Sequence, residues 1–342
     1  MAICNTDTTM KFFSDYSLLS HNTFGMDVKA RAFVEYGSVG ELQSLVREGA
    51  LREPFFHIGG GSNLLFTKDY EGTILHSGIH GTEVSVGERV RVKVGAAMVW
   101  DDFVALAVDS GWYGVENLSL IPGEVGASAV QNIGAYGVEA KDVIAEVECV
   151  DLRTGEVRLF SNAECKYGYR DSIFKGELRG RYAVTHVTYE LHREPRLHLE
   201  YGNIRDFLPQ DSSEPTPAGV RQAIINIRNS KLPDPKRLGN AGSFFMNPVV
   251  SETQFSALMG KYPGIPHYSV PGGVKIPAGW LIEQSGMKGY SCGRAAVYDK
   301  QALVIVNTGG ASPAEILSLS EMVKRSVMEK FGIAIETEVN FI

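Results

Sequence analysis

The chain has 342 residues, of which 44% are hydrophobic and 21% are charged, and its formal net charge is −7. This length allows two or three domains with a sizeable hydrophobic core. The acidic balance argues against non-specific binding of nucleic acids, because no basic stripe is present to hold the phosphates. The cysteines form neither a CxxC pair nor a metal-ligand spacing, so we expect no metal and free thiols at Cys4, Cys149, Cys165 and Cys292.

The N-terminal segment MAICNTDTTMKFF has no basic region followed by a long apolar core, which a signal peptide requires. No apolar run approaches the ~18 residues that span a membrane. We therefore expect a cytoplasmic protein with no membrane partner. Residues 1–18 are expected to form a loosely docked N-terminal arm.

Periodic apolar positions predict the secondary structure of the first half of the chain. Helical spacing is found over 38–49 and 100–111. Alternation of apolar and polar residues predicts strands over 90–94 and 182–191, and a hairpin over 143–160. The segment PFFHI, which directly precedes three glycines, predicts a further short strand.

The second half of the chain begins with the region 192–218, which is rich in polar residues and proline and is the best candidate for a domain boundary. A helix follows and is stopped by Pro233. The last helix opens with a capping box at Ser312 and ends at Gly332, and the final segment 333–342 alternates like a strand. Strands and helices are mixed without a regular βαβ repeat, which favours an α+β fold.

Two glycine-rich stretches predict a site for one large ligand. Residues 59–63, GGGSN, follow a short strand, and consecutive glycines expose backbone amides that can wrap an anion. Residues 121–137 carry four glycines among other small residues, which should make a poor core element but a good surface for close contact. Together they predict a ligand with a diphosphate and an aromatic ring system. The alternatives are a structural tight turn at 59–63 and two unrelated loops.

Polar residues in three other stretches indicate chemistry. Arg170 can bind a carboxylate through two hydrogen bonds, although a surface pair with Asp171 is the commoner meaning of such a motif. Ser243 lies between glycines and two phenylalanines, where a hydroxyl in a water-poor pocket could donate a proton. The alternative there is a plain glycine-rich turn. Glu336 and Glu338 share one side of the expected strand. One of them could be a buried carboxylate that assists proton transfer. The alternative is that both are solvated on an outer face.

Seven segments, in order, resemble the UDP-N-acetylenolpyruvoylglucosamine reductase (MurB) family in its longer, type I form. They cover nearly the whole chain after the arm, and the ordered set is highly specific. The segments are NTFG (22–25), GGGSNLLF (59–66), IPGEVGASAVQNIGAYGVE (121–139), YGYRDSIFK (167–175), SKLPDPK (230–236), GNAGSFFMNP (239–248) and AGWLIEQSGMKG (278–289). The resemblance implies an FAD-binding module of the vanillyl-alcohol-oxidase (PCMH) type, in two lobes over 19–195, and a C-terminal α+β substrate-binding domain over 196–342.

The resemblance also implies which residues bind ligands. Non-covalent FAD would be held by Gly59, Gly60, Gly61, Ser62, Asn63, Pro122, Gly123, Gly126, Ala127, Ser128, Gly134, Tyr136 and Gly137. The substrate nucleotide, its phosphates or NADPH would be contacted by Tyr201, Lys231, Asn247, Lys275 and Gln301. The chain departs from the family at Met246, where a lysine is common, and at Glu124 in the second glycine-rich stretch.

The implied reaction is the NADPH-dependent, FAD-mediated reduction of UDP-N-acetylglucosamine enolpyruvate to UDP-N-acetylmuramate, a step of peptidoglycan synthesis and cell-wall biogenesis. Arg170 would stabilise the enolate-like form of the substrate carboxylate, assisted by Glu338, and Ser243 would donate the proton. The family implies a monomer. Two alternatives remain open. One is a related flavin oxidase or dehydrogenase that acts on an alcohol or sugar, and the other is a non-catalytic flavin or nucleotide-sugar binding protein.

Overall fold

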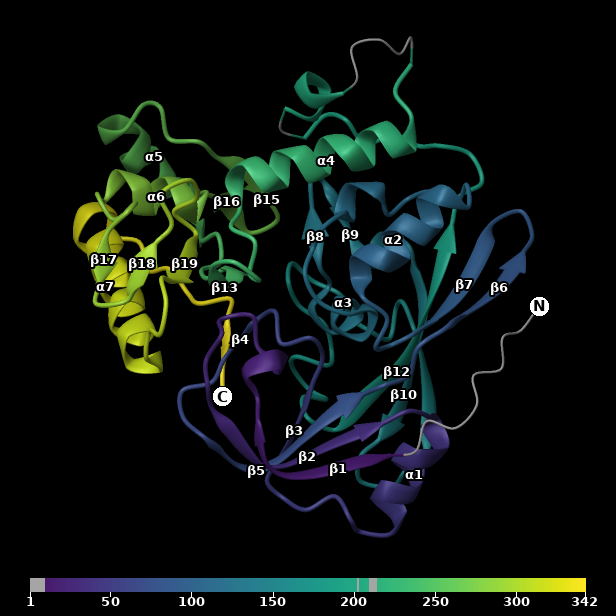
Figure 1. Ribbon diagram of the computed structural model, residues 1–342. Helices are drawn as coiled ribbons and strands as arrows, with labels where there is room; N and C mark the ends of the chain where they lie inside the picture. Colours follow the sequence, from purple (N-terminus) through teal and green to yellow (C-terminus); the bar gives the residue numbers. More distant parts are fainter. Residues whose placement is uncertain (1–9, 202, 209–213) are drawn as a thin grey trace. The chain divides into compact units, whose positions relative to one another are not determined.

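The computed structural model describes residues 10–201, 203–208 and 214–342 (Figure 1). The chain divides into two compact units, each assembled from three stretches. Unit 1 comprises Met1–Tyr16, Ala30–Gly60 and Tyr70–Ser230, and unit 2 comprises Ser17–Lys29, Gly61–Asp69 and Lys231–Ile342. In the described stretches, no helix combines the length and the apolar character needed to cross a membrane.

Two sheets form the frame of unit 1. The first has the order β1-β2-β5-β3, and β5 runs parallel to β2 and β3. The second is antiparallel with the order β11-β10-β12-β7-β6. The bounds are β1 Lys11–Ser17, β2 Lys29–Tyr36, β3 Phe55–Ile58, β5 Tyr70–Ser77, β6 Thr82–Val86, β7 Val90–Gly95, β10 Ile144–Asp151, β11 Val157–Ser161 and β12 Tyr182–Leu191, with a short hairpin of β8 Gly134–Ala135 and β9 Val138–Glu139.

Three α-helices of this part of the chain, α1, α2 and α4, lie where the sequence predicts helices, whereas α3 was not predicted. Ser38 caps the first helix by accepting a hydrogen bond from the amide of Glu41 (3.2 Å), while the Glu41 carboxylate accepts from Gly37 rather than from Ser38. The bounds are α1 Val39–Arg47, α2 Trp100–Asp109, α3 Val125–Gln131 and α4 Pro217–Lys231, with 3-10 turns η1 Leu19–His21, η2 Glu116–Leu118, η3 Ala140–Asp142 and η4 Ile204–Phe207.

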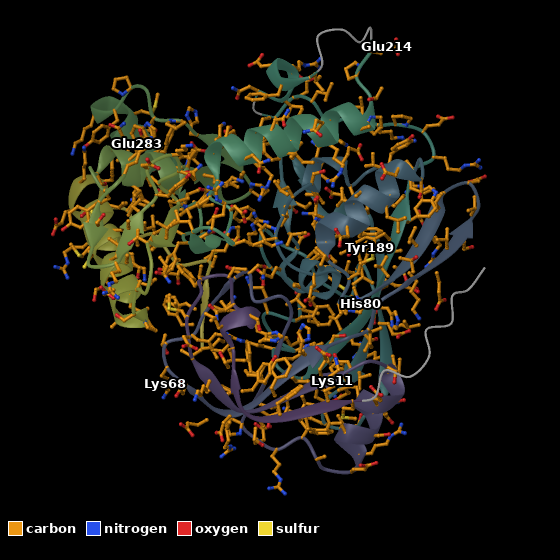
Figure 2. All side chains as sticks on the ribbon, viewed as in Figure 1. Lys11, Lys68, His80, Tyr189, Glu214 and Glu283 are labelled. Atoms are coloured by element: carbon orange, nitrogen blue, oxygen red, sulfur yellow. The ribbon has the colours of Figure 1, made fainter. Side chains whose placement is uncertain are left out.

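An aromatic cluster forms the centre of the unit 1 core. Trp100 and Phe103 of α2 pack on Tyr189 of β12, with ring centroids 5.8 and 4.6 Å from the tyrosine ring, and all three side chains are fully buried. Tyr189 is labelled in Figure 2. The Tyr189 hydroxyl lies 2.7 Å from the hydroxyl of Ser128 on α3. These two buried hydroxyls are therefore paired with each other, as burial requires.

Unit 2 contains three small sheets and three α-helices. Its largest sheet has the order β13-β19-β18-β17, the second has the order β14-β16-β15, and β20 pairs with β4 in parallel. The predicted last helix is confirmed: Ser312 and Glu315 form the capping box, and Gly332 ends the helix with φ +65°. The bounds are β4 Leu64–Leu65, β13 Gly239–Ser243, β14 Val249–Val250, β15 Tyr268–Val270, β16 Gly273–Lys275, β17 Ser291–Cys292, β18 Ala295–Val297, β19 Val304–Asn307, β20 Asn340–Phe341, α5 Glu252–Lys261, α6 Ala278–Gln284 and α7 Pro313–Phe331.

Part of the small-residue stretch 121–137 forms a core element, contrary to the expectation from residue size, while residues 121–124 and 133–137 stay half-buried or exposed. Residues 125–131 are helix α3, in which Gly126 and Ser128 are buried. A Cβ added at Gly126 would lie 2.9 Å from the Cβ of Ala96, and the Gly126 amide donates to the Ala96 carbonyl. Small side chains are thus needed because they let α3 pack directly on the end of β7.

Two terminal segments also differ from the prediction. Residues 11–17, placed in a loose arm, form strand β1, which pairs with β2; residues 1–9 lie outside the described part. The final segment is extended with alternating burial, but only β20 and a bridge at Thr337 form strand pairs. Cys149, Cys165 and Cys292 are free thiols, as predicted. Cys4 lies outside the described residues.

Candidate active site

Two predicted site loops of unit 1 are tied together by side-chain hydrogen bonds. Asn132, at the end of α3, donates through Nδ2 to the carbonyl of Gly168 (2.7 Å). Ser172 donates through its hydroxyl to the carbonyl of Val130 (2.6 Å). The segment that carries Arg170 is therefore held against the second glycine-rich stretch.

Several residues of these loops adopt a backbone conformation that side chains other than glycine rarely take. Leu120, Asn132, Tyr136 and Arg170 have φ of 58°, 45°, 49° and 55°. Each left-handed residue costs about 1–2 kcal/mol, and such conformations persist where the surrounding structure enforces them, often at ligand sites. At Arg170 the carbonyl accepts a hydrogen bond from Nζ of Lys175 (2.8 Å), which helps to hold the turn.

Arg228 of α4 is a functional candidate that the sequence analysis missed. Its Nε donates to the carbonyl of Leu120 (3.2 Å), and its guanidinium is hydrogen-bonded to Tyr136. Burial lowers the pKa of Arg228, and the positive charge of Arg170 lowers it further. Arg228 thus brings positive charge to Tyr136, and it lies close enough to Arg170 for the two charges to interact, which favours an anionic ligand. The sequence did contain one signal: Arg228 stands four residues after the buried Ile224, so both lie on the same face of the helix.

Two more residues border the second glycine-rich stretch. Tyr201 is exposed, and a Cβ added at Gly137 would lie 3.4 Å from the Tyr201 Cβ. Asn117, also missed by the sequence analysis, is buried and donates through Nδ2 to the carbonyls of Tyr136 (3.0 Å) and His198 (2.8 Å). Its buried Oδ1 accepts no hydrogen bond from the described residues, so it is available to an N–H or O–H group of a ligand.

Ser243 and Glu338 are brought together within unit 2. Ser243 ends β13, and the carbonyl of the next residue, Phe244, accepts a hydrogen bond from the amide of Glu338 (2.9 Å). Phe244 and Phe245, which follow the serine in the chain, are 0% and 1% exposed. A hydroxyl and a carboxylate are thus placed on adjacent backbone segments, while Glu336 is exposed.

The GGGSN turn contributes to both units, with Gly59 and Gly60 in unit 1 and the next three residues in unit 2. Asn63 donates through Nδ2 to the carbonyl of Glu338 (3.2 Å), and its own carbonyl accepts from the amide of Asn340 (3.1 Å). The turn is therefore bound to the segment that carries the candidate carboxylate.

The remaining predicted substrate residues are distributed over unit 2. Asn247 accepts through Oδ1 from the amide of Ala278 (2.9 Å), the first residue of α6, and Gln301 accepts from the amide of Leu303 (3.3 Å). Lys275 lies in β16, where its strand partner is Val249 of β14. Lys231 is an exposed residue at the end of α4. Asn247 and Gln301 therefore have contacts within the fold that also fix their side chains.

The structural need for glycine at position 61 predicts a large effect on stability. Gly61 has φ +65°, and a Cβ there would lie 2.0 Å from the carbonyl oxygen of His21. Gly49 is a matched control, because it has φ +63° but no atom within 4 Å of an added Cβ. We expect Gly49→Ala to lower the free energy of unfolding by about 1 kcal/mol and Gly61→Ala by about 3 kcal/mol or more. Urea titration measures both; equal losses would contradict the close approach.

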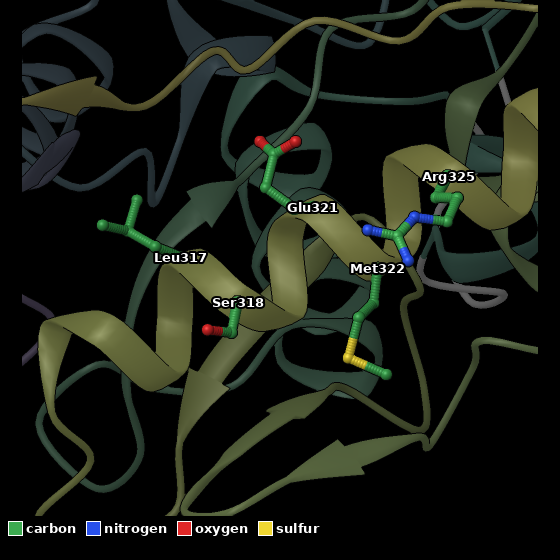
Figure 3. Close-up of a pocket in the computed structure, with 5 residues that line it drawn as sticks. All are labelled: Leu317, Ser318, Glu321, Met322 and Arg325. Carbon is green, nitrogen blue, oxygen red and sulfur yellow. The ribbon is translucent and has the colours of Figure 1, made fainter.

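A surface hollow on α7 includes none of the predicted site residues. Figure 3 shows that its five lining side chains all come from this one helix: Leu317, Ser318, Glu321, Met322 and Arg325. The arrangement brings together no residues that are distant in the sequence, so the candidate site stays with the loops described above.

Comparison with known proteins finds matches over nearly the whole chain. A family model described as FAD binding domain matches residues 30–161, and one described as UDP-N-acetylenolpyruvoylglucosamine reductase, C-terminal domain, matches residues 234–342. A reductase of this name from Bacteroides fragilis is 57% identical over 330 residues, covering 96% of this chain and 99% of that protein. One from Porphyromonas gingivalis is 47% identical, covering 97% and 100%.

A solved structure shows the same fold. The UDP-N-acetylenolpyruvylglucosamine reductase of Thermus caldophilus matches with a TM-score of 0.68 at 22% identity, covering 97% of this chain and 98% of that one. With the two family models, this match confirms the predicted α+β fold, in which an FAD-binding domain is followed by a C-terminal domain.

Proposed function

Because the chain belongs to the UDP-N-acetylenolpyruvoylglucosamine reductase family, we propose that it reduces UDP-N-acetylglucosamine enolpyruvate to UDP-N-acetylmuramate at the expense of NADPH. The family places it among the FAD-dependent oxidoreductases of peptidoglycan synthesis. The observation that supports the chemistry best is the main-chain hydrogen bond from Glu338 to Phe244, which joins the segment of Glu338 to the residue that follows Ser243.

FAD is the cofactor of this family, and the two glycine-rich stretches fit it. We assign the Gly59-Gly60 turn to the flavin diphosphate, because consecutive glycines expose amides that can wrap an anion. The buried Asn117 Oδ1 offers a hydrogen-bond acceptor beside Tyr136. The guanidinium of Arg228 offers a positive charge next to the same tyrosine. When bound, FAD carries hydride from NADPH to the methylene carbon of the enol ether. The residues proposed to hold it non-covalently are Gly59, Gly60, Gly61, Ser62, Asn63, Pro122, Gly123, Gly126, Ala127, Ser128, Gly134, Tyr136 and Gly137. Within this set Ser128 and Gly126 act by packing, since both are buried in α3.

Three residues of the chain perform the rest of the proposed reaction. Arg170 binds the substrate carboxylate through its two-pronged guanidinium and stabilises the enolate-like charge that develops there. Ser243 donates its hydroxyl proton to the carbon next to that carboxylate. Glu338 stabilises the enol form through a hydrogen bond. One hydride and one proton are thus added across the C=C bond, which gives the lactyl ether of the product.

Local groups must hold both nucleotides, because the chain as a whole is negatively charged. We assign contacts with the substrate nucleotide, its phosphates or NADPH to Tyr201, Lys231, Asn247, Lys275 and Gln301. The proposal also includes a monomer in the cytoplasm. Light scattering of the purified protein tests the monomer, and a dimer mass would overturn that part.

A product assay tests the proposed reaction. Protein incubated with NADPH and UDP-N-acetylglucosamine enolpyruvate should form UDP-N-acetylmuramate, identified by a mass increase of two hydrogens. A related oxidase would form none and would reduce oxygen instead. Acid precipitation separates the two further, because non-covalent FAD stays in the supernatant, whereas a tethered flavin would colour the pellet.

The contacts of Arg228 predict a role in FAD binding. Replacing it in Arg228→Met removes charge-assisted hydrogen bonds to the Leu120 carbonyl and to Tyr136. Because both bonds stay within the protein, the loss for FAD is that of a positive charge several Å from its phosphates, worth about 1–2 kcal/mol. The FAD dissociation constant should therefore rise roughly 5- to 30-fold. Arg228→Lys keeps the positive charge but not the planar guanidinium. Its FAD dissociation constant should therefore lie between those of the wild type and Arg228→Met. Wild-type affinity in Arg228→Met, measured by flavin fluorescence, would contradict the assignment.

A further inference from the structure

Charged side chains gather where the parallel strands of unit 1 end. Glu35 on β2 and His76 on β5 are register partners, and the Nζ of Lys11 lies 2.7 Å from the Glu35 carboxylate. The His76 ring lies between two carboxylates: its Nδ1 is 3.4 Å from Glu35, and its Nε2 is 3.3 Å from Glu124. The His76 and Glu124 side chains are only 12% and 13% exposed, so solvent screens their interaction weakly.

The Glu124 carboxylate also packs against the first glycine turn. His76 is the register partner of Ile58, the residue before Gly59. A Cβ added at Gly59 or Gly60 would lie 3.2 or 3.4 Å from the carboxylate oxygens of Glu124. A negative charge therefore lies beside the amides that we assigned to the flavin diphosphate, where like charges repel.

His76 is the group that can remove this repulsion. Burial lowers the pKa of His76, but hydrogen bonds and charge from Glu124 and Glu35 outweigh it and raise the pKa above its ordinary value. With the imidazole protonated, His76 and Lys11 balance the two carboxylates. Without that proton, one negative charge remains uncompensated beside the turn.

The other groups that face His76 do not titrate in the same range. Phe33 of β2 packs along the His76 ring, with centroids 6.0 Å apart. His57 of β3 has its pKa lowered to about 3 by burial and by the charge of His76, so it is neutral near pH 7. Its Nε2 is hydrogen-bonded to the hydroxyl of Tyr36 (2.9 Å), and burial raises the pKa of that phenol.

We propose that protonated His76 is a positioning residue that holds the Glu124 carboxylate and cancels its charge at the Gly59-Gly60 turn, so that FAD binds more tightly when His76 carries its proton. This proposal rests on the assignment of the turn to the flavin diphosphate in the proposed function. Affinity for FAD should be highest below the pKa of His76 and should fall as the pH rises through it. The loss of one positive charge several Å from the diphosphate predicts a rise in the dissociation constant of roughly three- to tenfold.

A double-mutant cycle tests the proposal on the full-length chain. The FAD dissociation constant is measured by quenching of flavin fluorescence from pH 6 to about pH 9, a range that brackets the ordinary pKa of histidine. FAD binding by the wild type should weaken roughly three- to tenfold across this range. His76→Gln should bind weakly at every pH, whereas Glu124→Gln should bind tightly at every pH. In the double variant, His76→Gln should add nothing to Glu124→Gln.

A second histidine–glutamate pair provides the matched control. His186 Nδ1 lies 2.8 Å from Glu148, with side chains 19% and 15% exposed, so His186→Gln removes a similar contact elsewhere in unit 1. It should keep the wild-type pH profile for FAD. The proposal is overturned if the wild-type affinity is independent of pH, or if His76→Gln weakens FAD equally with and without Glu124. Tight, pH-independent binding in all variants would remove this proposal alone, whereas no FAD binding by the wild type would remove the proposed function as well.

Discussion

Ser243→Ala should leave flavin reduction by NADPH nearly unchanged and slow flavin reoxidation by the enolpyruvyl substrate about 10²- to 10⁴-fold, the range expected when a positioned proton donor is removed. The serine ends β13 beside the buried Phe244, whose carbonyl is bonded to the Glu338 amide. Removing one hydroxyl oxygen leaves this backbone pairing in place, so the loss should be chemical and not structural. Single-turnover measurement of each half-reaction separates the two effects.

Ser243→Cys is the matched variant for this experiment. A thiol also donates a proton, with an ordinary pKa of about 8.5, and occupies nearly the same space as the hydroxyl. We expect it to recover a measurable part of the reoxidation rate that Ser243→Ala loses. If Ser243→Ala slowed both half-reactions equally, or if the thiol restored nothing, the serine would be a structural residue and not the donor.

Arg170→Lys should lower the rate of substrate reduction by a factor of about 10² or more, the size expected when one donor to a developing negative charge is lost. Lysine keeps the charge, but its point-like ammonium cannot reproduce the bidentate geometry of a guanidinium. The backbone of Arg170 is already held in the left-handed region by the loop contacts of Ser172 and Lys175. The change therefore removes the fork from a position that the fold fixes.

Arg158→Lys is the control for loss of a guanidinium. Arg158 pairs with Glu164 on the surface, where both side chains are about half exposed (48% and 50%), and such a pair contributes little. We expect wild-type kinetics in that variant. Stopped-flow traces should place the Arg170→Lys defect in the half-reaction with substrate, and wild-type turnover would remove Arg170 from the mechanism.

Much of the fold was predictable where apolar spacing and end signals agree. The helix from Pro313 to Phe331 has its capping box, its buried stripe and its terminal Gly332 as the sequence predicts. The hairpin of β10 and β11 forms over the predicted range, with Val150 paired with Val157 next to its turn. In such segments local propensity and tertiary packing favour the same structure.

The role of the small residues in α3 could not be predicted in this way. A low-volume stretch such as 125–131 resembles a loop in composition, and only the approach of Ala96 to Gly126 shows why small side chains are needed in a core helix. Burial is set here by a partner about thirty positions away, which periodicity does not detect.

The candidate site was predictable as residue types but not as an arrangement. The sequence drew attention to Ser243 and Glu338 separately, and their proximity depends on a hydrogen bond between residues 244 and 338. Arg228 was missed because its importance comes from contacts with Leu120 and Tyr136, more than ninety positions away. Long-range contacts of this kind need the folded structure.

The central claim is that the protein passes reducing equivalents from NADPH through its flavin to an enolpyruvyl nucleotide. Anaerobic stopped-flow at the absorbance band of oxidised flavin tests it most directly. NADPH is added first, and UDP-N-acetylglucosamine enolpyruvate is mixed in after the band has bleached. The band should recover without oxygen. Recovery only after air is admitted would contradict the proposed reaction and identify an oxidase.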